Sequence, residues 1–333
     1  MAMKKLNFES EIKEAKKLTF KEKVKKAFDF KQKWYNFRHY DWKKWARKNL
    51  TLNGIGHFGW IVLRAIIVIG LCFLILYPFL VKAVVSFMSV NDITDSTVMF
   101  IPREGSTYFI KRAVYSMNYF PALLKTALLS LLVAVAQLFI SCVVGYGFAR
   151  FKFKGKNVLF FIVILTLIVP AETIIVPLYK RFTSWGMIDT IWPVVILSIC
   201  GLGLKNGLYI YLMQQFFRGL PKELEQSAYI DGAGPLRAFW SIMLPNASNM
   251  MITVFLFSFT WQWTDTTYNA MLCPNLNILA NVVLNVSSGV TDKVQAAAVE
   301  DTATLLVILP LLIVFLFAQR YFIQSIERSG LVE

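Results

Sequence analysis

The charged residues of one segment between two apolar stretches are the first candidates for chemistry in this chain. The segment "KELEQSAYIDGAGPLRAFWSIMLP" covers residues 222–245. Carboxylates in such a group can act as acid–base catalysts, or they can form ion pairs with another protein surface. No catalytic constellation accompanies them, since the only histidines, His39 and His57, lie in the N-terminal part. The acids and the base that precede the segment's midpoint are Lys222, Glu223, Glu225 and Asp231.

The first half of this segment has the pattern of a short helix that offers one face to a partner. Pro221 suits the first helical position, and the acids of the first turns complement the positive end of the helix dipole. Gly232 supplies the usual stop. Two small side chains, Ser227 and Ala228, share a face with Leu224 and Asp231, so another surface could approach closely there.

The second half has an apolar periodicity that predicts burial. After Pro235, apolar residues recur at helical spacing, and we expect them to be buried against the chain's own spans or at the membrane interface, with Pro245 ending the segment. The alternative is an amphipathic connector that only covers the end of a helix bundle. The predicted anchoring residues are Leu236, Phe239, Trp240, Met243, Leu244 and Pro245.

The composition places the chain among integral membrane proteins. Of its 333 residues, 56% are hydrophobic and 17% are charged, whereas soluble domains average about 45–50% and 25%. The net charge is +15, and residues 1–59 hold sixteen Lys/Arg against six Asp/Glu. Such a basic tail suits either nucleic acid or anionic lipid, and its interleaved aromatic residues favour the membrane interface. We therefore expect a basic, aromatic-rich arm over 1–59 and a transmembrane domain over 60–333.

Six apolar stretches are long enough to be considered as membrane spans. The basic link "RFKFKGKN" after the second stretch and the basic arm both predict a cytoplasmic location under the positive-inside rule. With six crossings, both termini and residues 222–245 are then cytoplasmic, and the loops near 82–121, 180–190 and 264–302 face outward. The predicted spans are Ile61–Val81, Ala122–Phe148, Val158–Tyr179, Ile191–Met213, Met250–Trp263 with its polar continuation, and Ala303–Phe322.

Polar and aromatic residues within the later stretches suggest a solute path. Pro170 and Pro177 bracket Glu172, and irregular backbone at membrane depth is tolerated where it lines a cavity or packs on protein. In "FTWQWTD", flat tryptophan faces suit sugars, and the polar groups can hydrogen-bond them. The alternatives are an aromatic belt for the tryptophans and the outer interface for Glu172. The path candidates are Glu172, Trp261, Gln262, Trp263 and Asp265.

The order "E-L-E-x-x-A-x-x-D-G-A … F-W-x-I-x-L-P" resembles the cytoplasmic EAA loop of permease subunits of bacterial ABC importers. The likeness is greatest to carbohydrate-type permeases of the MalG kind, and it covers roughly residues 61–333, with the loop at 218–245. "VPAETIIVPLY", "MQQFFRGLPKEL" and "LFAQRYF" also look like family features. The resemblance implies an all-α, six-span, type I (MetI-like) importer fold with both termini in the cytoplasm.

In that family the first helix of the loop inserts into a cleft of the ATPase subunit. Where the family has Glu-Ala-Ala, this chain has Gln226-Ser227-Ala228, so the charge-dependent part of docking would fall to Glu225. The small Ser227 preserves the shape of the fit. The residues that the resemblance assigns to ATPase coupling are Glu223, Glu225, Gln226, Ser227, Ala228, Asp231, Gly232 and Ala233.

The sequence thus predicts a multi-pass permease of the bacterial plasma membrane that imports a sugar, with an oligosaccharide as the leading candidate. No "GxxxxGK[ST]" motif occurs, so ATP and Mg²⁺ would be bound by a separate ATPase chain, and no cofactor is expected in this one. The expected partners are a second, homologous permease, two ATP-binding cassette subunits, an extracellular solute-binding protein and membrane lipids, but no nucleic acid. The alternatives are the same importer architecture for a non-sugar solute, and a stand-alone channel or membrane-embedded enzyme.

Overall fold

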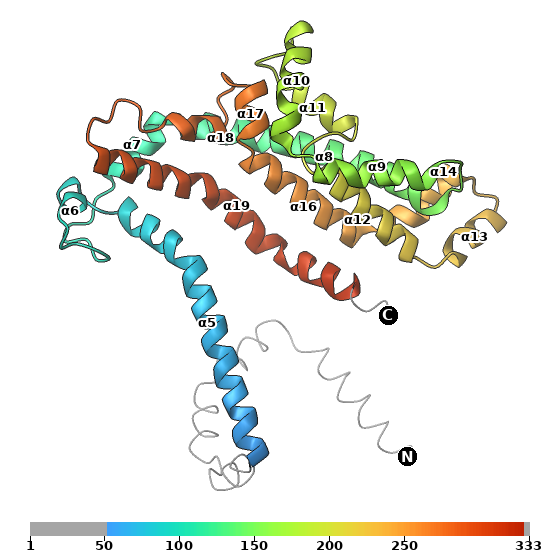
Figure 1. The fold of residues 1–333 in the computed structure, drawn as a ribbon, viewed down its shortest axis with the longest axis horizontal. Coiled ribbons are helices and arrows are strands. Elements are labelled where there is room, and N and C mark those ends of the chain that lie inside the picture. Colours follow the sequence, from blue (N-terminus) through green and yellow to red (C-terminus); the bar gives the residue numbers. More distant parts are fainter. Residues whose placement is uncertain (1–51, 330–333) are drawn as a thin grey trace, which may run out of the picture. The chain divides into compact units, whose positions relative to one another are not determined.

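The computed structural model describes residues 52–329, which form helices and connecting loops (Figure 1). The N-terminal arm predicted over 1–59 lies largely outside the described residues. The chain divides into residues 1–76 and 77–333, and each part is described by itself. The helices before the middle of the chain are α5 (Leu52–Ser86), α6 (Val90–Thr94), α7 (Tyr108–Ser116), α8 (Tyr119–Arg150), α9 (Lys156–Ile168) and α10 (Ala171–Ser184).

The second half contains shorter and more irregular elements. A π-helical turn, η1, interrupts the segment after residue 235, and a 3₁₀ turn, η2, precedes the last helix. The elements are α11 (Trp192–Ile199), α12 (Asn206–Gly219), α13 (Glu223–Ile230), α14 (Pro235–Ala238), η1 (Phe239–Met243), α15 (Leu244–Asn246), α16 (Ser248–Thr264), α17 (Thr267–Leu272), α18 (Leu279–Val282), η2 (Val283–Asn285) and α19 (Lys293–Ser329).

Three described helices are long and apolar enough to cross a membrane: Gly59–Ser86, Tyr119–Arg150 and Lys293–Gln319. Two bent pairs have the same character, so up to five spans can be counted by length and composition. The predicted first, second and sixth spans fall inside α5, α8 and α19. The predicted third, fourth and fifth spans are interrupted or adjoin a sharp bend.

The third predicted span breaks at Pro170. The helices on either side are bent by 100°, and Val169 before the proline is extended, as the proline ring favours. The fourth predicted span is two helices, α11 and α12, joined by residues 200–205, in which Gly201 and Lys205 adopt left-handed backbone angles. The fifth, α16, follows α15 at a bend of 78°.

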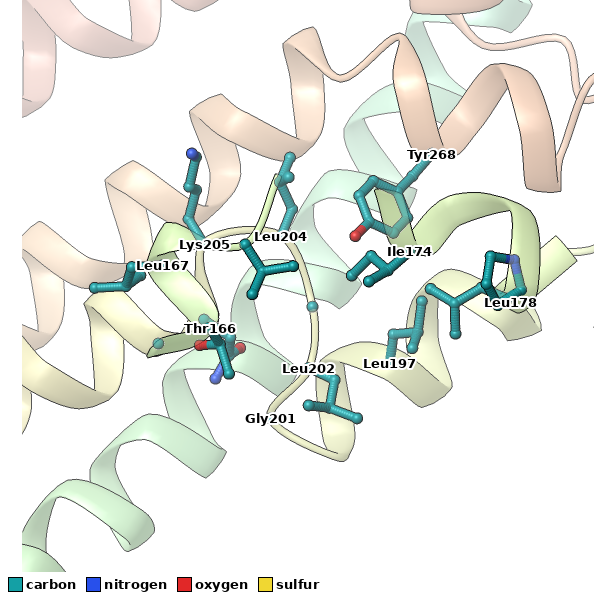
Figure 2. Close-up of a pocket in the computed structure, with 15 residues that line it drawn as sticks. Thr166, Leu167, Ile174, Leu178, Leu197, Gly201, Leu202, Leu204, Lys205 and Tyr268 are labelled. Carbon is teal, nitrogen blue, oxygen red and sulfur yellow. The ribbon is translucent and has the colours of Figure 1, made fainter. Parts of the chain in front are cut away.

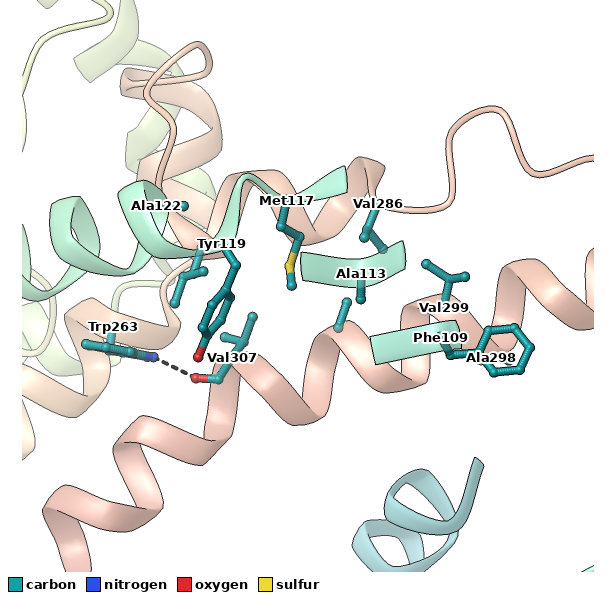
Figure 3. Packing of buried hydrophobic residues seen from close by; sticks show 12 residues of the cluster. Phe109, Ala113, Met117, Tyr119, Ala122, Trp263, Val286, Ala298, Val299 and Val307 are labelled. Atoms are coloured by element: carbon teal, nitrogen blue, oxygen red, sulfur yellow. Dashed lines mark hydrogen bonds between the residues drawn. The ribbon is translucent and has the colours of Figure 1, made fainter. Parts of the chain in front are cut away.

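The buried apolar residues form three clusters, and α8 contributes to each of them. In the first cluster, α7 and the start of α8 pack on α19 and on the end of α16. Tyr119 donates a hydrogen bond to the Leu306 carbonyl, and Trp263 donates one to the Val307 carbonyl at 3.0 Å (Figure 3). These two bonds replace those that buried phenol and indole groups would otherwise make with water. This cluster fixes the end of α16 that carries the predicted solute-path residues.

The second and third clusters pack other parts of α8 against the rest of the chain. Near its end, α8 packs with α12, η1 and α16, where Tyr146, Phe217 and Phe239 are in ring contact. In its first half, α8 packs with α10, α11 and α17. Helix α8 is therefore the common support for the segment at 222–245 and for the irregular region between α9 and α12.

Candidate functional site: the segment at residues 222–245 and the cavity beside α12

Helix α13 has the predicted end and a slightly different start. It begins at Glu223, with Lys222 as its N-cap. Pro221 was predicted to occupy the first helical position, but it lies before the N-cap. Gly232 has φ +80°, and the Gly232 and Ala233 amides donate to the Tyr229 and Ala228 carbonyls. This pair of bonds is the Schellman arrangement that satisfies the last carbonyls of a helix.

The exposed side of α13 differs from the predicted one at two positions. Glu225 and Ala228 were predicted to be presented to a partner, but both side chains are buried. Eight residues make only about two helical turns, so the side that packs on α14 and η1 takes these two positions. Ala233 is half-buried. The other predicted coupling residues are exposed: Glu223, Gln226, Ser227, Asp231 and Gly232.

Glu225 belongs to a polar cluster, which we call the Glu225 cluster: Tyr146, Arg150, Glu225 and Tyr229, of which Tyr229 is exposed. One carboxylate oxygen accepts hydrogen bonds from the hydroxyls of Tyr146 and Tyr229, the latter at 3.1 Å. The other lies 3.3 Å from Nε of Arg150, with the two side chains 6% and 9% exposed. Partial burial raises the pKa of Tyr229 above its ordinary value, so this hydroxyl remains a donor.

Arg150 also ties the cluster to the end of α12. One terminal nitrogen of its guanidinium donates a 2.8 Å hydrogen bond to the carbonyl of Leu220. Arginine suits this position because its charge faces the Glu225 carboxylate while a terminal nitrogen donates to a carbonyl. The last turn of α8, the end of α12 and the first turn of α13 are thus joined through one side chain.

The second half of the segment is anchored by fewer residues than its apolar pattern predicts. Phe239, Met243 and Leu244 are buried, whereas Leu236 is 77% exposed and Trp240 is exposed. The π-helical turn η1 changes the number of residues per turn, so constant helical spacing does not hold across it. Leu236 and Trp240 are therefore not buried within the chain, although the Trp240 ring stacks on Phe139 of α8, and their burial at the membrane interface stays a prediction.

Pro245 does not end the segment. It lies inside α15, and the sharp bend comes at Ala247, before α16. The interior of a helix rarely accepts proline, but Pro245 occupies a first-turn position of α15, where its missing N–H costs little.

Sequence reasoning missed Ile230, the most exposed large apolar residue of the segment at 86%. It ends α13, three residues after Ser227 and four after Gln226, which places the three on one face. We call the group of Gln226, Ser227, Ile230 and Asp231 the docking face. The signal that would have found Ile230 is this same spacing from the two residues that replace the family's Glu-Ala.

Three of the five predicted solute-path residues are engaged in holding the fold. Gln262 is buried and donates to Oδ1 of Asn269, and Trp263 is buried against α19. Asp265 accepts hydrogen bonds from the amides of the first turn of α17. Burial raises the pKa of this carboxyl above its ordinary value, and the three amides oppose that shift.

The prediction that Gln262, Trp263 and Asp265 face a solute path is therefore not supported by their contacts. Because α16 turns successive tryptophans to different sides, Trp261 is exposed while Trp263 is buried. The Nζ atom of Lys205 lies 5.2 Å from the centre of the Trp261 ring. Glu172 is exposed in the first turn of α10.

A cavity of about 460 Å³ lies beside the irregular link between α11 and α12 (Figure 2). Its walls are mostly aliphatic, and Thr166, Lys205, Asn206 and Tyr268 add polar groups. Asn206 is 1% exposed; its amide nitrogen reaches Ser141 at 3.4 Å, and its side-chain oxygen has no hydrogen-bond partner. A mostly apolar cavity with a few convergent polar groups is the usual form of a small-molecule site.

A polar side chain of α8 also holds the link between α11 and α12 in place. Gln137 donates to the carbonyl of Leu204, which lines the cavity, at 3.2 Å, and it accepts a hydrogen bond from Ser258 of α16. A side chain at Gly203 would collide with Gln137, so glycine is needed there for the close approach.

The model of the family described as "binding-protein-dependent transport system inner membrane component" matches residues 137–328. The chain belongs to this family. The matched residues run from the second half of α8 to α19, and they include the cavity, the docking face and the whole Glu225 cluster.

Relatives of this permease carry names from sugar and glycerol-phosphate transport. It is 27% identical to the arabinooligosaccharides transport system permease protein AraQ of Bacillus subtilis (strain 168), over 64% of this chain and 73% of the relative. It is 29% identical to the sn-glycerol-3-phosphate transport system permease protein UgpE of Pectobacterium atrosepticum, over 62% and 72%.

The fold of the permease also matches a solved structure. A chain of a bacterial ABC transporter involved in the import of the acidic polysaccharide alginate superposes with a TM-score of 0.67, covering 79% of this chain and 96% of the other. The sequence identity is 20%, so this match concerns the fold. The permease is thus a multi-pass inner-membrane transport subunit of an ABC importer and not an enzyme, and its family works with an ATPase and a binding protein.

Proposed function

We propose that this permease carries a carbohydrate, and an oligosaccharide in particular, across the bacterial plasma membrane. It does so with six crossings and both termini in the cytoplasm, beside a second homologous permease and two ATP-binding cassette subunits. The names of the relatives support the solute class, and the run of Lys152, Lys154 and Lys156 after α8 supports the orientation. ATP and Mg²⁺ belong to the partner subunits in this proposal.

The observation that carries the coupling role is the docking face. Its small and polar residues surround Ile230, whose side chain is 86% exposed on a loop that the orientation places in water. Covering one such apolar side chain contributes about 1.5–3 kcal/mol. A cleft of an ATPase subunit, closing on this face, would supply that cover and would move α13 when it opens.

The test uses bulky substitution at an exposed position of α13. Ser227→Trp leaves the interior of the permease untouched, so we expect loss of ATPase co-purification and of solute uptake through steric exclusion at the partner. The matched control is Ser241→Trp, at an exposed serine of η1. Ser227 is preferred to Ala228, which is buried, and to Gly232, whose φ of +80° would strain any side chain.

Normal uptake and normal ATPase binding in Ser227→Trp would overturn the coupling proposal. Equal losses in Ser227→Trp and Ser241→Trp would also overturn it, because the effect would then not belong to α13.

We place the solute beside α12, in the 460 Å³ cavity. The ring of Tyr268 offers an aromatic surface, and the unpaired oxygen of Asn206 can accept a hydrogen bond from a sugar hydroxyl. Glu172 and Trp261, which are exposed, are proposed as outer parts of the same path. In this proposal, Gln262, Trp263 and Asp265 hold the site in place and do not contact the solute.

The solute site is tested by the Michaelis constant for uptake. Tyr268→Phe removes one hydroxyl from the cavity, and we expect the KM for an oligosaccharide to rise severalfold with ATPase binding unchanged. Tyr179→Phe, on α10 but not among the cavity residues, is the control. An unchanged KM in Tyr268→Phe would remove the cavity from the path.

The glycerol-phosphate relatives make a non-sugar solute the competing candidate. A thermal-shift series on the cognate binding protein, with neutral oligosaccharides and with glycerol phosphates, separates the two. Stabilisation by glycerol phosphates alone would contradict the proposed solute class.

A further inference from the structure

The carboxylate at the centre of the Glu225 cluster is closed to an outside partner. Both oxygens of the Glu225 carboxylate are occupied by groups of this chain, and its side chain is 9% exposed. This carboxylate cannot form an ion pair with a docking protein without first losing its three partners within the chain. The charge of Glu225 therefore serves the permease itself.

Helix α13 has little else to fix its position. Its buried residues are Glu225 and Ala228, and alanine buries too little surface to anchor a helix of eight residues. Its other contacts are with α14 and η1, which follow it directly in the chain. The contacts of Glu225 are thus what holds α13 against the end of α8.

Arg150 connects this helix to α8, and α8 also holds the link between α11 and α12 that lines the cavity. Gln137, which holds the Leu204 carbonyl, lies thirteen residues before Arg150 on the same helix, or about 20 Å along its axis. Because α8 is an uninterrupted helix from Tyr119 to Arg150, displacement at one contact is carried to the other.

We propose that Arg150 is a positioning residue that latches the coupling helix to α8, so that movement of α13 reaches the cavity through α8. This inference rests on the proposed coupling function of the docking face. It assigns Glu225 to force transmission inside the permease, and it leaves recognition of the ATPase to Gln226, Ser227, Ile230 and Asp231.

The test separates transmission from assembly in the full transporter, purified with its ATPase and reconstituted with its binding protein. Glu225→Gln keeps the shape and the tyrosine contacts but removes the charge opposite Arg150; Arg150→Met removes both guanidinium contacts. We expect each variant to co-purify with the ATPase, while uptake per ATP hydrolysed falls about tenfold. Asp95→Asn, which removes the charge of an exposed pair with Arg103, is the matched control and should leave that ratio unchanged.

A second pair of variants guards against a simple loss of folding. The exchange of the two charges, Arg150→Glu with Glu225→Arg, should recover part of the uptake per ATP that each single exchange loses. Replacement of both residues by methionine removes the buried charges together, so it should restore thermal stability but not the uptake ratio.

Several outcomes would overturn the latch. A normal uptake ratio in Glu225→Gln or Arg150→Met would do so, as would a double methionine variant with full coupling. Loss of ATPase co-purification in Glu225→Gln would assign the acid to docking instead. The proposed coupling function fails separately, through Ser227→Trp, so a normal ratio in Glu225→Gln beside a blocked Ser227→Trp rejects the latch alone.

Discussion

Two glycines on α8 provide a matched test of how closely α8 and α12 pack. At Gly145, an added Cβ would lie 2.8 Å from the Cβ of Met213, 3.0 Å from the amide nitrogen of Gln214 and 3.2 Å from the Ile210 carbonyl oxygen. Two of these atoms are backbone, so they cannot move without moving α12. At Gly147, one half-turn further along the same helix, an added Cβ meets nothing within 4 Å.

The magnitude follows from two opposing effects of Gly→Ala. Alanine in a helix interior is favoured over glycine by about 0.8–1 kcal/mol, and this gain applies at both positions. Overpacking at Gly145 costs about 1–3 kcal/mol and applies there alone. We therefore expect Gly147→Ala to be neutral or stabilising, and Gly145→Ala to be less stable than Gly147→Ala by about 1–3 kcal/mol.

The assay is thermal unfolding of the detergent-purified transporter, followed at fixed protein and lipid concentration. For a folded unit of this size, the stability difference between the two variants corresponds to a Tm difference on the order of 2–10 °C. Because the α8–α12 contact lies between the Glu225 cluster and the cavity link, uptake should fall in Gly145→Ala as well. Equal Tm values for the two variants would refute the close packing on which this reasoning rests.

Two further predictions concern the end of α16. Trp263→Phe keeps a ring but removes the indole donor to the buried Val307 carbonyl, so we expect a loss of about 1–3 kcal/mol of stability in thermal unfolding. Trp192→Phe, at an exposed site, should cost little. Equal Tm values for the two variants would contradict this prediction. Asp265→Ala removes the acceptor of three amides at the start of α17, so we expect a loss of about 0.5–2 kcal/mol of stability. Because α17 carries Tyr268, the KM for uptake should rise as well. An unchanged KM would contradict the positioning role of Asp265.

The local features of the coupling segment could be predicted from the sequence. Gly232 ends α13 because a left-handed residue there completes the C-terminal hydrogen bonds, and this depends on neighbours within six positions. The long apolar stretches likewise required only hydropathy and length. Features that depend only on neighbouring residues could therefore be predicted from the sequence.

The partners of Glu225 could not be predicted, because Arg150 lies seventy-five residues away and only the packing of α8 on α12 brings them together. The π-helical turn at Phe239–Met243 could not be predicted either: it shifts the helical phase, and Phe239 and Met243 within it belong to the cluster formed with distant residues of α8 and α12. Prolines gave a mixed signal: Pro170 breaks the chain between α9 and α10, whereas Pro177 and Pro310 lie within continuous helices.

In the proposed coupling, α13 passes the movement of an ATPase subunit to the membrane part of the permease. The most direct measurement of this coupling is site-specific photocrosslinking from position 230 in the assembled transporter, compared with position 104 in the loop before α7. We predict an adduct with the ATPase subunit from position 230, in an amount that changes when ATP binds, and none from position 104. No ATPase adduct at position 230, or one that is equally strong at both positions, would contradict it.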